Sequence, residues 1–470
     1  MALRLSLLLT VCATTILATQ TQGQVPPGEG PALGTNRIEQ SDITGGGLSK
    51  FDIRKAGLKI FSTPFNQHDG YGDGPEDLND TTSPGHRPTL QGNGTFLRIN
   101  GLDSQSCMEC HSVGSNTVAP FRFAIGGVGG SNNNAMFQPT NIDVDDDAGV
   151  GEARFNGRYI NPPFLFGSGG IELLSKEMTR DLLDIRRIAR TQPGVVFQLD
   201  TKGVNFGTIR FLGPPFNFID ITGIEGVGTD LVVRPFGRKG DNATVRQFDV
   251  GALNFHMGMQ PEEDVGTNVD DDGDGVVNEI LIGELSALHI FNTNFEPPTQ
   301  DALTPAGVLG SQVFNTIGCA DCHIPTLETN SPVLSYSFPE VHTAPNKNVF
   351  YSVDLSDSPT SFALNQGGGI SVPLFADLKL HNMGPGLKED FAGNSSDFFF
   401  TTARLWGLAD TAPYLHDGRA LTLTEAILQH GGEAQGARDN FDNLAPAQRI
   451  EVLTYLRSLR TPIDPATDLL

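Results

Sequence analysis

The pentad Cys-x-x-Cys-His occurs twice in the 470 residues of this chain, at Cys107–His111 and at Cys319–His323. This spacing lets two thiols bond to one haem while the adjacent histidine reaches its iron. A single copy is weak evidence, because Cys-x-x-Cys also serves zinc sites and thiol redox chemistry. The repeat, with histidine following both times, predicts two covalently bound haem c groups. The expected attachment sites are Cys107, Cys110, Cys319 and Cys322, and the expected iron ligands are His111 and His323.

The fifth cysteine, Cys12, lies in an N-terminal stretch with the features of a secretion signal, expected to span residues 1–23. Arg4 supplies the positive start and Leu5 to Ala18 the apolar core. After cleavage only the four motif cysteines would remain, which leaves neither a disulfide framework nor a redox dithiol. Structural zinc is the alternative to haem, and spacing, export and cysteine count together favour haem. We therefore expect a periplasmic or otherwise exported bacterial protein, with no membrane span after signal removal.

The charge and composition narrow the class of protein further. A net charge of −24 excludes a nucleic-acid binder and argues against binding to anionic membranes. The 55 glycines and 30 prolines predict that much of the chain is loop. Loops around short helices suit haem proteins, so the predicted fold class is mainly α with long irregular loops, built from two cytochrome c-like haem domains.

Four segments have the pattern of helices. Residues 56–61 and 306–314 precede the two motifs, residues 284–291 form a third helix, and a closing helix runs from Pro446 to Leu459. The third helix ends before Pro297-Pro298, which is a plausible domain boundary. The predicted division is an N-terminal haem domain of residues 24–298, with insertions and an acidic loop, and a C-terminal haem domain of residues 299–470.

Several segments resemble one known family. The run from Thr411 to Ala420, with residues 423–427 and 430–434 after it, resembles the di-haem oxidoreductases of the bacterial di-haem cytochrome c peroxidase superfamily, some of which are called thiol oxidoreductases. The same holds for residues 382–387, 405–408 and 238–240, and the resemblance is densest from His381 to the end. It implies an oxidoreductase with peroxidase activity. A thiol activity receives no support, because no free thiol survives export.

The ligand on the second face of each iron must come from elsewhere in the chain. For the haem at His323 we favour His430, which ends a helix with a Thr422/Glu425 capping box before Gly431-Gly432. In the resembling peroxidases this position holds the sixth ligand of the electron-transfer haem. Ligation by two histidines implies a lower potential than His/Met ligation. Met383 is the runner-up, and His342, His381 and His416 are further candidates.

The haem at His111 has fewer candidates. No histidine lies between His111 and His256, and the only methionines there are Met136 and Met178. An open distal face is therefore predicted, and peroxide could bind there. Glu172, in a segment that resembles the glycine-rich turn of the family, is the candidate acid/base for peroxide cleavage. Alternatively, Glu172 is an ordinary helix-start charge, or His256 ligates this iron and closes the site.

One acidic loop predicts a calcium site. Asp270, Asp272 and Asp274 occupy positions one, three and five of a calcium-loop pattern, and Gly275 occupies position six. Position twelve is Leu281 rather than the usual glutamate, so a true EF-hand is not expected. An irregular loop that binds Ca²⁺ and a solvated acidic turn remain the two alternatives.

These observations predict an exported di-haem c-type oxidoreductase. Electrons from a small redox protein would enter at the second haem, and a small oxidant such as peroxide would be reduced at the first. One alternative is a pure electron-transfer cytochrome in which both irons are six-coordinate. Another is a haem-dependent oxygenase of an organic substrate.

Overall fold

The computed structural model describes residues 29–72, 104–109, 111, 136–143, 154–163, 165–389, 395–462 and 468–469. The expected signal segment, Cys12 and Cys110 lie outside the described residues. No helix of the described part is both long and apolar enough to cross a membrane.

The prediction of a mainly α protein is wrong. The structure is 35% helix and 15% strand, so it is a mixed α and β fold. The strands form five two-stranded sheets and one three-stranded sheet in the described part of the chain, and every pairing between them is antiparallel. The two-stranded pairs are β1 (Met136–Asp143) with β2 (Arg154–Ile160), β6 (Thr299–Gln300) with β13 (Leu459–Arg460), β7 (Leu327–Glu328) with β10 (Ser371–Val372), β8 (Val333–Ser337) with β9 (Val349–Asp354), and β11 (Leu380–Asn382) with β12 (Phe399–Thr401).

The three-stranded sheet shows why the strands were missed. β3 (Val196–Thr201) and β4 (Val204–Leu212) are joined by Lys202-Gly203, and β5 (Phe218–Asp220) completes the sheet. Lys202 and Gly203 have φ angles of 52° and 81°, as a tight two-residue hairpin turn requires. The sequence carried this signal, because apolar residues alternate on both sides of a residue pair that ends in glycine.

Helices are present at all four predicted segments, although the closing helix ends at Leu456 and Leu459 lies in strand β13. The four helices are α2 (Lys50–Ser62), α6 (Ile282–Asn292), α7 (Pro305–Thr316) and α10 (Pro446–Leu456). Ser49 caps α2, Thr304 caps α7, and proline opens both α7 and α10. Hydrogen-bonding side chains at these starts satisfy amide groups that a helix leaves unpaired.

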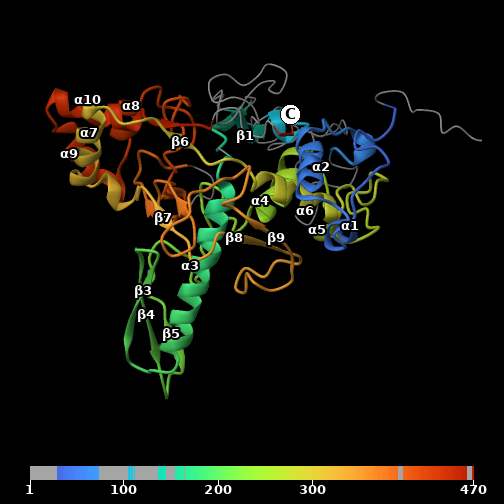
Figure 1. Cartoon of the computed structure of the whole chain (residues 1–470), viewed down its shortest axis with the longest axis horizontal. Helices are drawn as coiled ribbons and strands as arrows, with labels where there is room; N and C mark the ends of the chain where they lie inside the picture. The colour runs from blue at the N-terminus through green and yellow to red at the C-terminus, as the bar shows by residue number, and fades with distance from the viewer. Residues whose placement is uncertain are drawn as a thin grey trace, which may run out of the picture.

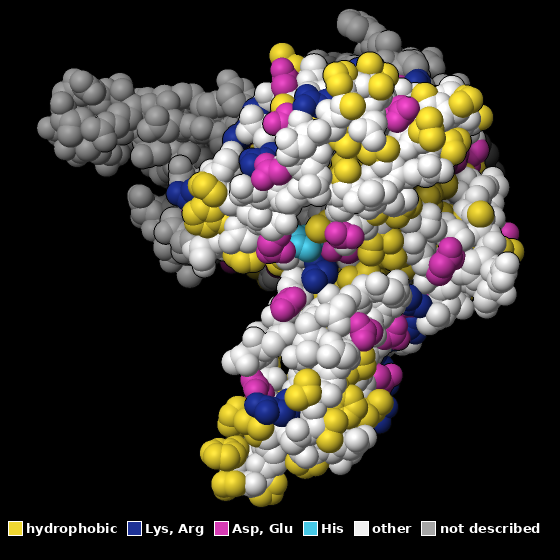
Figure 2. All heavy atoms as spheres, turned by 90° about the vertical axis from the view of Figure 1, so that its left-hand side faces the viewer, with side chains coloured by type: hydrophobic (Ala, Val, Ile, Leu, Met, Phe, Trp, Pro, Cys, Tyr) yellow, Lys and Arg dark blue, Asp and Glu magenta, His cyan; other side chains and the backbone are white. Residues whose placement is uncertain are grey.

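The helices gather in two groups at opposite ends of the molecule (Figure 1). One group contains α7 and α10 with α8 (Leu423–Leu428) and α9 (Gln435–Asp442). The other contains α2 and α6 with α1 (Gln40–Thr44), α4 (Val245–Ala252) and α5 (Glu262–Val265). Between them runs the long helix α3 (Ser168–Ala189), beside which β3, β4 and β5 project from the body. Hydrophobic side chains lie at the end of this projection (Figure 2), where Phe216 and Phe218 are exposed.

Buried apolar side chains form three clusters. One packs against Cys107 and contains residues of α2 and α6. Another packs against Cys319 and contains residues of α7 and α10. The third lies between them and combines α3 with residues from 327 to 406, so it draws on both sides of residue 298. The domain boundary at 298 stays a prediction.

The C-terminal end returns to the N-terminal group of helices. Arg54 of α2 is only 2% exposed, and its guanidinium pairs with the Asp468 carboxylate. Leu469 packs against the apolar cluster around Cys107. The last described residues therefore contact the region of the first motif, far from it in sequence.

Candidate functional site

The second motif lies in a tight turn that follows α7. Gly318 adopts a left-handed conformation with φ of 92°, and the 3₁₀ turn η5 (Cys319–Asp321) begins directly after it. The His323 amide donates to the Cys319 carbonyl at 3.0 Å. The His323 ring donates through Nδ1 to the Phe375 carbonyl at 3.0 Å. A backbone acceptor at Nδ1 leaves the Nε2 lone pair available to a metal, which is the usual arrangement of metal-binding histidines.

His430 is held in the same way. The Thr422 side chain accepts from the Glu425 amide in a capping box that opens α8, and His430 follows the end of that helix. The His430 ring donates through Nδ1 to the Ala426 carbonyl at 2.8 Å. Nε2 of this ring is therefore also the nitrogen available to a metal.

The rings of His323 and His430 are neighbours, with their centroids 6.4 Å apart and their planes at 61° to each other. A metal held by two imidazole nitrogens at about 2.0–2.1 Å each would separate the centroids by about 6 Å. Burial, together with His430, lowers the pKa of His323 to about 4, and burial also lowers the pKa of His430. Both rings are thus neutral, the form that binds a metal, and the pair fits an iron between them.

The backbone of Met383 lies beside Gly431, which follows His430. The Met383 amide donates to the Phe398 carbonyl at 2.9 Å, and a side chain at Gly431 would press on the Met383 carbonyl. The ring beside His323 in the structure belongs to His430. The choice between the two as iron ligand stays a prediction.

The motif cysteines within the described residues form no disulfide with one another. Cys107, Cys319 and Cys322 are all partly buried thiols. Burial, together with nearby Asp321, raises the pKa of Cys319 to about 11.

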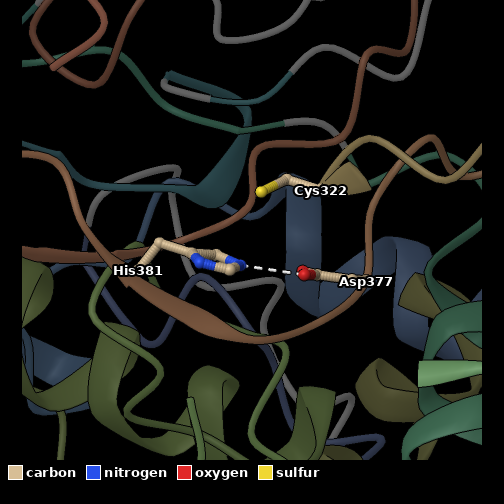
Figure 3. A group of neighbouring side chains, drawn as sticks. All are labelled: Cys322, Asp377 and His381. Carbon is tan, nitrogen blue, oxygen red and sulfur yellow. Dashed lines mark hydrogen bonds and ion pairs between the residues drawn. The ribbon is translucent and has the colours of Figure 1, made fainter. Parts of the chain in front are cut away.

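His381 forms a group with Cys322 and Asp377 that the sequence did not predict (Figure 3). Its Nε2 lies 2.8 Å from Asp377 Oδ2 and its Nδ1 lies 2.7 Å from Glu433 Oε2. Although burial lowers the pKa of His381, Asp377 and its other partners raise it to about 11. His381 is therefore a charged imidazolium with both nitrogens engaged, and it is not available to an iron.

His416 lies in a second polar group. Its ring packs on Phe400 at 4.7 Å between centroids, and Nε2 is 3.7 Å from Glu389 Oε1. Glu389 also pairs with Arg238 Nε at 2.7 Å, and burial lowers the pKa of His416 to about 4. Arg419 donates to the Gly386 carbonyl at 2.7 Å. The segments at 238–240, 382–387 and 411–420, which carry the family resemblance, thus meet in space.

The first motif lies against the apolar cluster of α2 and α6. Cys107 is in the 3₁₀ turn η3 (Cys107–Glu109), and the His111 amide donates to the Cys107 carbonyl at 2.9 Å. Burial, together with the neighbouring His256, lowers the pKa of His111 to about 4. Nδ1 of His111 is buried beside the Pro163 backbone without a well-aligned partner. The role of His111 as an iron ligand stays a prediction.

His256 reaches this site from an irregular helix. A five-residue π-helical stretch, η4 (Leu253–Met257), continues α4, and Gly258 ends it with φ of 68°. Met257 and Met259 are buried in the apolar cluster, whereas the His256 ring is only partly buried and lies near His111. The alternative in which His256 ligates the first iron and closes the site stays a prediction. Of the other methionines, Met136 begins β1, and Met178 is buried in α3.

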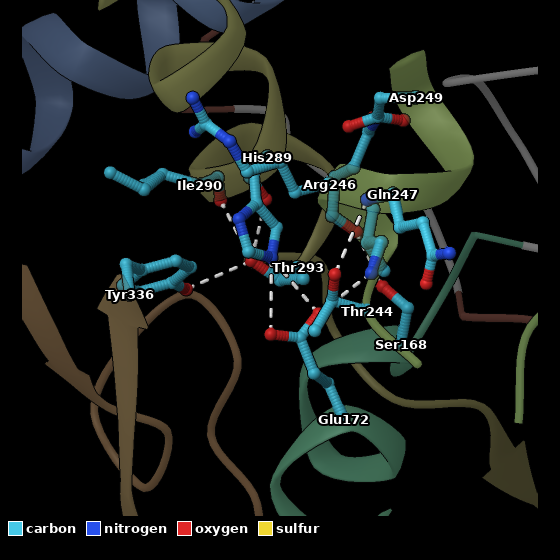
Figure 4. Close-up of polar contacts among 12 residues, drawn as sticks. Ser168, Glu172, Thr244, Arg246, Gln247, Asp249, His289, Ile290, Thr293 and Tyr336 are labelled. Carbon is cyan, nitrogen blue, oxygen red and sulfur yellow. Dashed lines mark hydrogen bonds and ion pairs between the residues drawn. The ribbon is translucent and has the colours of Figure 1, made fainter. Parts of the chain in front are cut away.

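Glu172 is the centre of a fully buried polar network (Figure 4). Its carboxylate accepts from Lys176 Nζ at 2.6 Å and from the Val245 amide at 2.9 Å, and it lies 2.9 Å from His289 Nε2. Burial raises the pKa of Glu172, but His289 and Lys176 lower it more, so the net pKa is below the ordinary value. These contacts join α3, α4 and α6. None of the contacts just given involves His111, and the acid/base role stays a prediction.

The sequence did not single out His289, although one signal was present. His289 is the only histidine in the apolar helix α6, and it is fully buried. A buried imidazole requires polar partners, which here are supplied by α3.

The acidic loop has the clustered geometry expected of a cation site. Ligand atoms of Asp270, Asp272 and Asp274 all lie within 4.8 Å of one another. Their role in binding Ca²⁺ stays a prediction at this point.

Comparisons with known proteins give one family and 21 chains of solved structures. Residues 350–459 match the family described as "Di-haem oxidoreductase, putative peroxidase". Hydrazine synthase of Kuenenia stuttgartiensis, in a structure under 20 bar xenon, is 16% identical over 61% of this chain and 92% of that chain, with a TM-score of 0.27. A MauG-like protein associated with microbial copper homeostasis is 17% identical over 47% of this chain and 68% of that chain, with a TM-score of 0.25.

Both TM-scores are too low to indicate a shared overall fold. No curated protein matches the chain in sequence. The family match covers the strands β9 to β12, the loop of His416, and the helices α8 to α10. The C-terminal segment of residues 350–459 is therefore similar to the di-haem oxidoreductase family.

Proposed function

We propose that this protein is an exported di-haem c-type oxidoreductase that carries electrons, with a histidine on each face of both irons. His323 and His430 would hold the second iron, and His111 and His256 the first. Cys319 and Cys322 would attach the second haem. Cys107 and Cys110 would attach the first.

The observation that supports this proposal most is the pairing of His323 with His430. Their rings are 6.4 Å apart, and each donates through Nδ1 to a backbone carbonyl. Haem iron, when bound, supplies one-electron redox chemistry whose potential depends on its axial ligands. The chain contributes ring orientation and a neutral charge state, and both are in place at this pair.

The first site supports the same proposal, although its second histidine, His256, is less rigidly held. His256 lies close enough to lower the pKa of His111. Its place in a π-helical stretch differs from the regular helix before His430, and such stretches occur frequently at functional sites. This difference favours a second candidate function, peroxide reduction at the first haem after His256 moves away.

A spectrum of the oxidised protein separates the two functions. If both irons are held by two histidines, only low-spin signals appear, and neither cyanide nor peroxide changes them. Peroxide reduction requires a high-spin fraction that peroxide converts, together with turnover of a reduced small cytochrome. A low-spin protein that consumes peroxide rapidly would contradict the electron-carrier proposal.

The proposal also includes export of the protein and a small redox protein as its electron donor. The positive and apolar pattern of residues 1–23 supports cleavage of a signal and a periplasmic location. The net charge of −24 favours a basic redox protein as electron donor. N-terminal sequencing of the mature protein tests the first point, because a chain that still begins at Met1 would contradict it.

A further inference from the structure

The acidic loop between α5 and α6 holds three carboxylates in a fixed arrangement. Asp270 accepts from the Gly273 amide at 2.8 Å and from the Gly275 amide at 3.0 Å, and Asp274 accepts from the Val276 amide at 2.7 Å. The three aspartates bring ligand atoms within 4.8 Å of one another. Oxygens on opposite sides of a Ca²⁺ ion, each at about 2.3–2.6 Å from it, are about 5 Å apart. The cluster therefore has the size of one coordination shell.

A fourth carboxylate beside this loop has an unsatisfied oxygen. Glu279 is only 2% exposed, and its Oε1 has no hydrogen-bond partner. Its Oε2 accepts from the Gln260 amide at 2.7 Å. A side chain at Gly70 would collide with Cδ, Cγ and Oε2 of Glu279, so the backbone of Gly70 covers that side of the carboxylate. Oε1 is the oxygen left for another partner.

Glu279 lies near the three aspartates. Burial, together with Asp272, Asp274 and Asp270, raises the pKa of Glu279 to about 9. Arg37 lies nearby but donates to the Glu279 backbone carbonyl at 2.8 Å and pairs with the Glu284 carboxylate. A buried carboxylate oxygen without a partner is costly, so Oε1 is the atom that a bound cation would satisfy.

We propose that Asp270, Asp272, Asp274 and Glu279 bind one Ca²⁺ ion, with Glu279 in the role that the glutamate at position twelve has in an EF-hand. Glu279 is the tenth residue of the loop, and Leu281 stands at the twelfth. An all-oxygen, acidic site of irregular geometry suits Ca²⁺, whereas Mg²⁺ demands a near-ideal octahedron and keeps its waters.

The site would also join separate parts of the chain. The backbone amide of Gln260 donates to the Glu279 carboxylate, and Oε1 of the Gln260 side chain accepts from the Asp271 amide at 3.1 Å. Gly70 belongs to the turn after α2. An ion in the loop would thus tie the start of α6, the segment around Gln260 and the N-terminal group of helices together, and binding would stabilise the folded state.

Calorimetric titration tests the proposal on the full haem-loaded protein, stripped with EGTA. Ca²⁺ should bind with a dissociation constant of about 1 mM or tighter, the range of extracellular calcium modules, and Mg²⁺ should bind at least tenfold more weakly. Both Glu279→Gln and Asp270→Asn should bind one Ca²⁺ fewer or bind it at least tenfold more weakly. Asp354→Asn is the matched control, because Asp354 accepts backbone and hydroxyl bonds from Ser356 in a turn on β9 and should leave binding unchanged.

Two results would overturn the proposal. Unchanged Ca²⁺ affinity and stoichiometry in Glu279→Gln would remove Glu279 as a ligand. Absence of any Ca²⁺ binding by the parent chain would remove the site. Should a variant fail to fold, the parent chain alone still decides: its melting temperature must rise with Ca²⁺ and not with equal Mg²⁺, and an unchanged melting temperature counts against the site.

Discussion

Each of the two motif histidines would need a second iron ligand from a distant segment, and the two regions provide that ligand differently. Near His323, the second histidine follows a capped α-helix, and its ring is fixed by the Ala426 carbonyl at 2.8 Å. Near His111, the second histidine lies in a π-helical stretch and is only partly buried. In the proposed function, the pentad would supply one ligand of each iron, and the rigidity of a distant segment would determine whether the second ligand stays bound.

The largest expected effect comes from removing the better-held histidine. His430→Ala should convert the second haem from low spin to high spin and leave the first unchanged, because His430 supplies the ring beside His323. Electron paramagnetic resonance of the oxidised protein measures this. His342→Ala is the control. An unchanged spectrum in His430→Ala would make Met383 or another group the ligand.

Glu172→Ala should lower the free energy of unfolding by about 3–5 kcal/mol, because it leaves Lys176 and His289 buried without their partner. The first haem should be disturbed more than the second, since Glu172 accepts from the Val245 amide at the start of α4, which leads to His256. Denaturant unfolding followed at the haem bands measures both effects. The exposed Glu225→Ala should change stability by less than about 0.5 kcal/mol.

The same carboxylate predicts the pH dependence. His289 and Lys176 outweigh burial and hold the pKa of Glu172 below its ordinary value of 4.5. Because the folded pKa is the lower one, the stabilisation is present above pH 4.5 and is lost as the pH falls further. Unfolding curves of the parent chain and Glu172→Gln should therefore converge in acid. Parallel curves down to the lowest pH would contradict this.

His256→Ala tests whether the looser histidine closes the first site. Its removal should raise the rate of the spectral change with peroxide at least tenfold, equivalent to about 1.4 kcal/mol. Stopped-flow mixing with peroxide measures the rate. A parent protein that already reacts as fast as the variant would show that the first face is open.

The smallest expected effects come from the helix caps before the two second histidines. Thr422 caps α8 and Thr244 caps α4, and each side chain accepts a backbone amide. Substitution of either threonine by alanine should lower the free energy of unfolding by about 1 kcal/mol. If the two sites differ in rigidity, Thr422→Ala should broaden the spectrum of the second haem. Thr244→Ala should broaden the spectrum of the first haem little, because that spectrum should already be broad.

The sequence predicted what depends on local patterns. Helices α2, α6, α7 and α10 follow from apolar spacing with proline or capping residues at their starts. The hairpin of β3 and β4 was missed, although Lys202-Gly203 marks its turn, because glycine-rich stretches were interpreted as loop.

Contacts between distant residues could not be predicted in the same way. His381 is held by Asp377, four residues earlier, and by Glu433, 52 residues later, and no local pattern encodes the second partner. The approach of His256 to His111 likewise depends on how α4 packs. His430 could be proposed from the sequence only because a capping box and a family resemblance marked its position.

The ion pair between Arg54 and Asp468 has a consequence for proteolysis. Arg54 is almost fully buried in α2, and its partner carboxylate lies beyond the last helix of the described chain. A protease that removes the segment carrying Asp468 and Leu469 would leave a buried guanidinium unpaired and uncover the apolar cluster beside Cys107. A cut after the second haem motif would thus weaken the region of the first, although the two segments are far apart in the sequence.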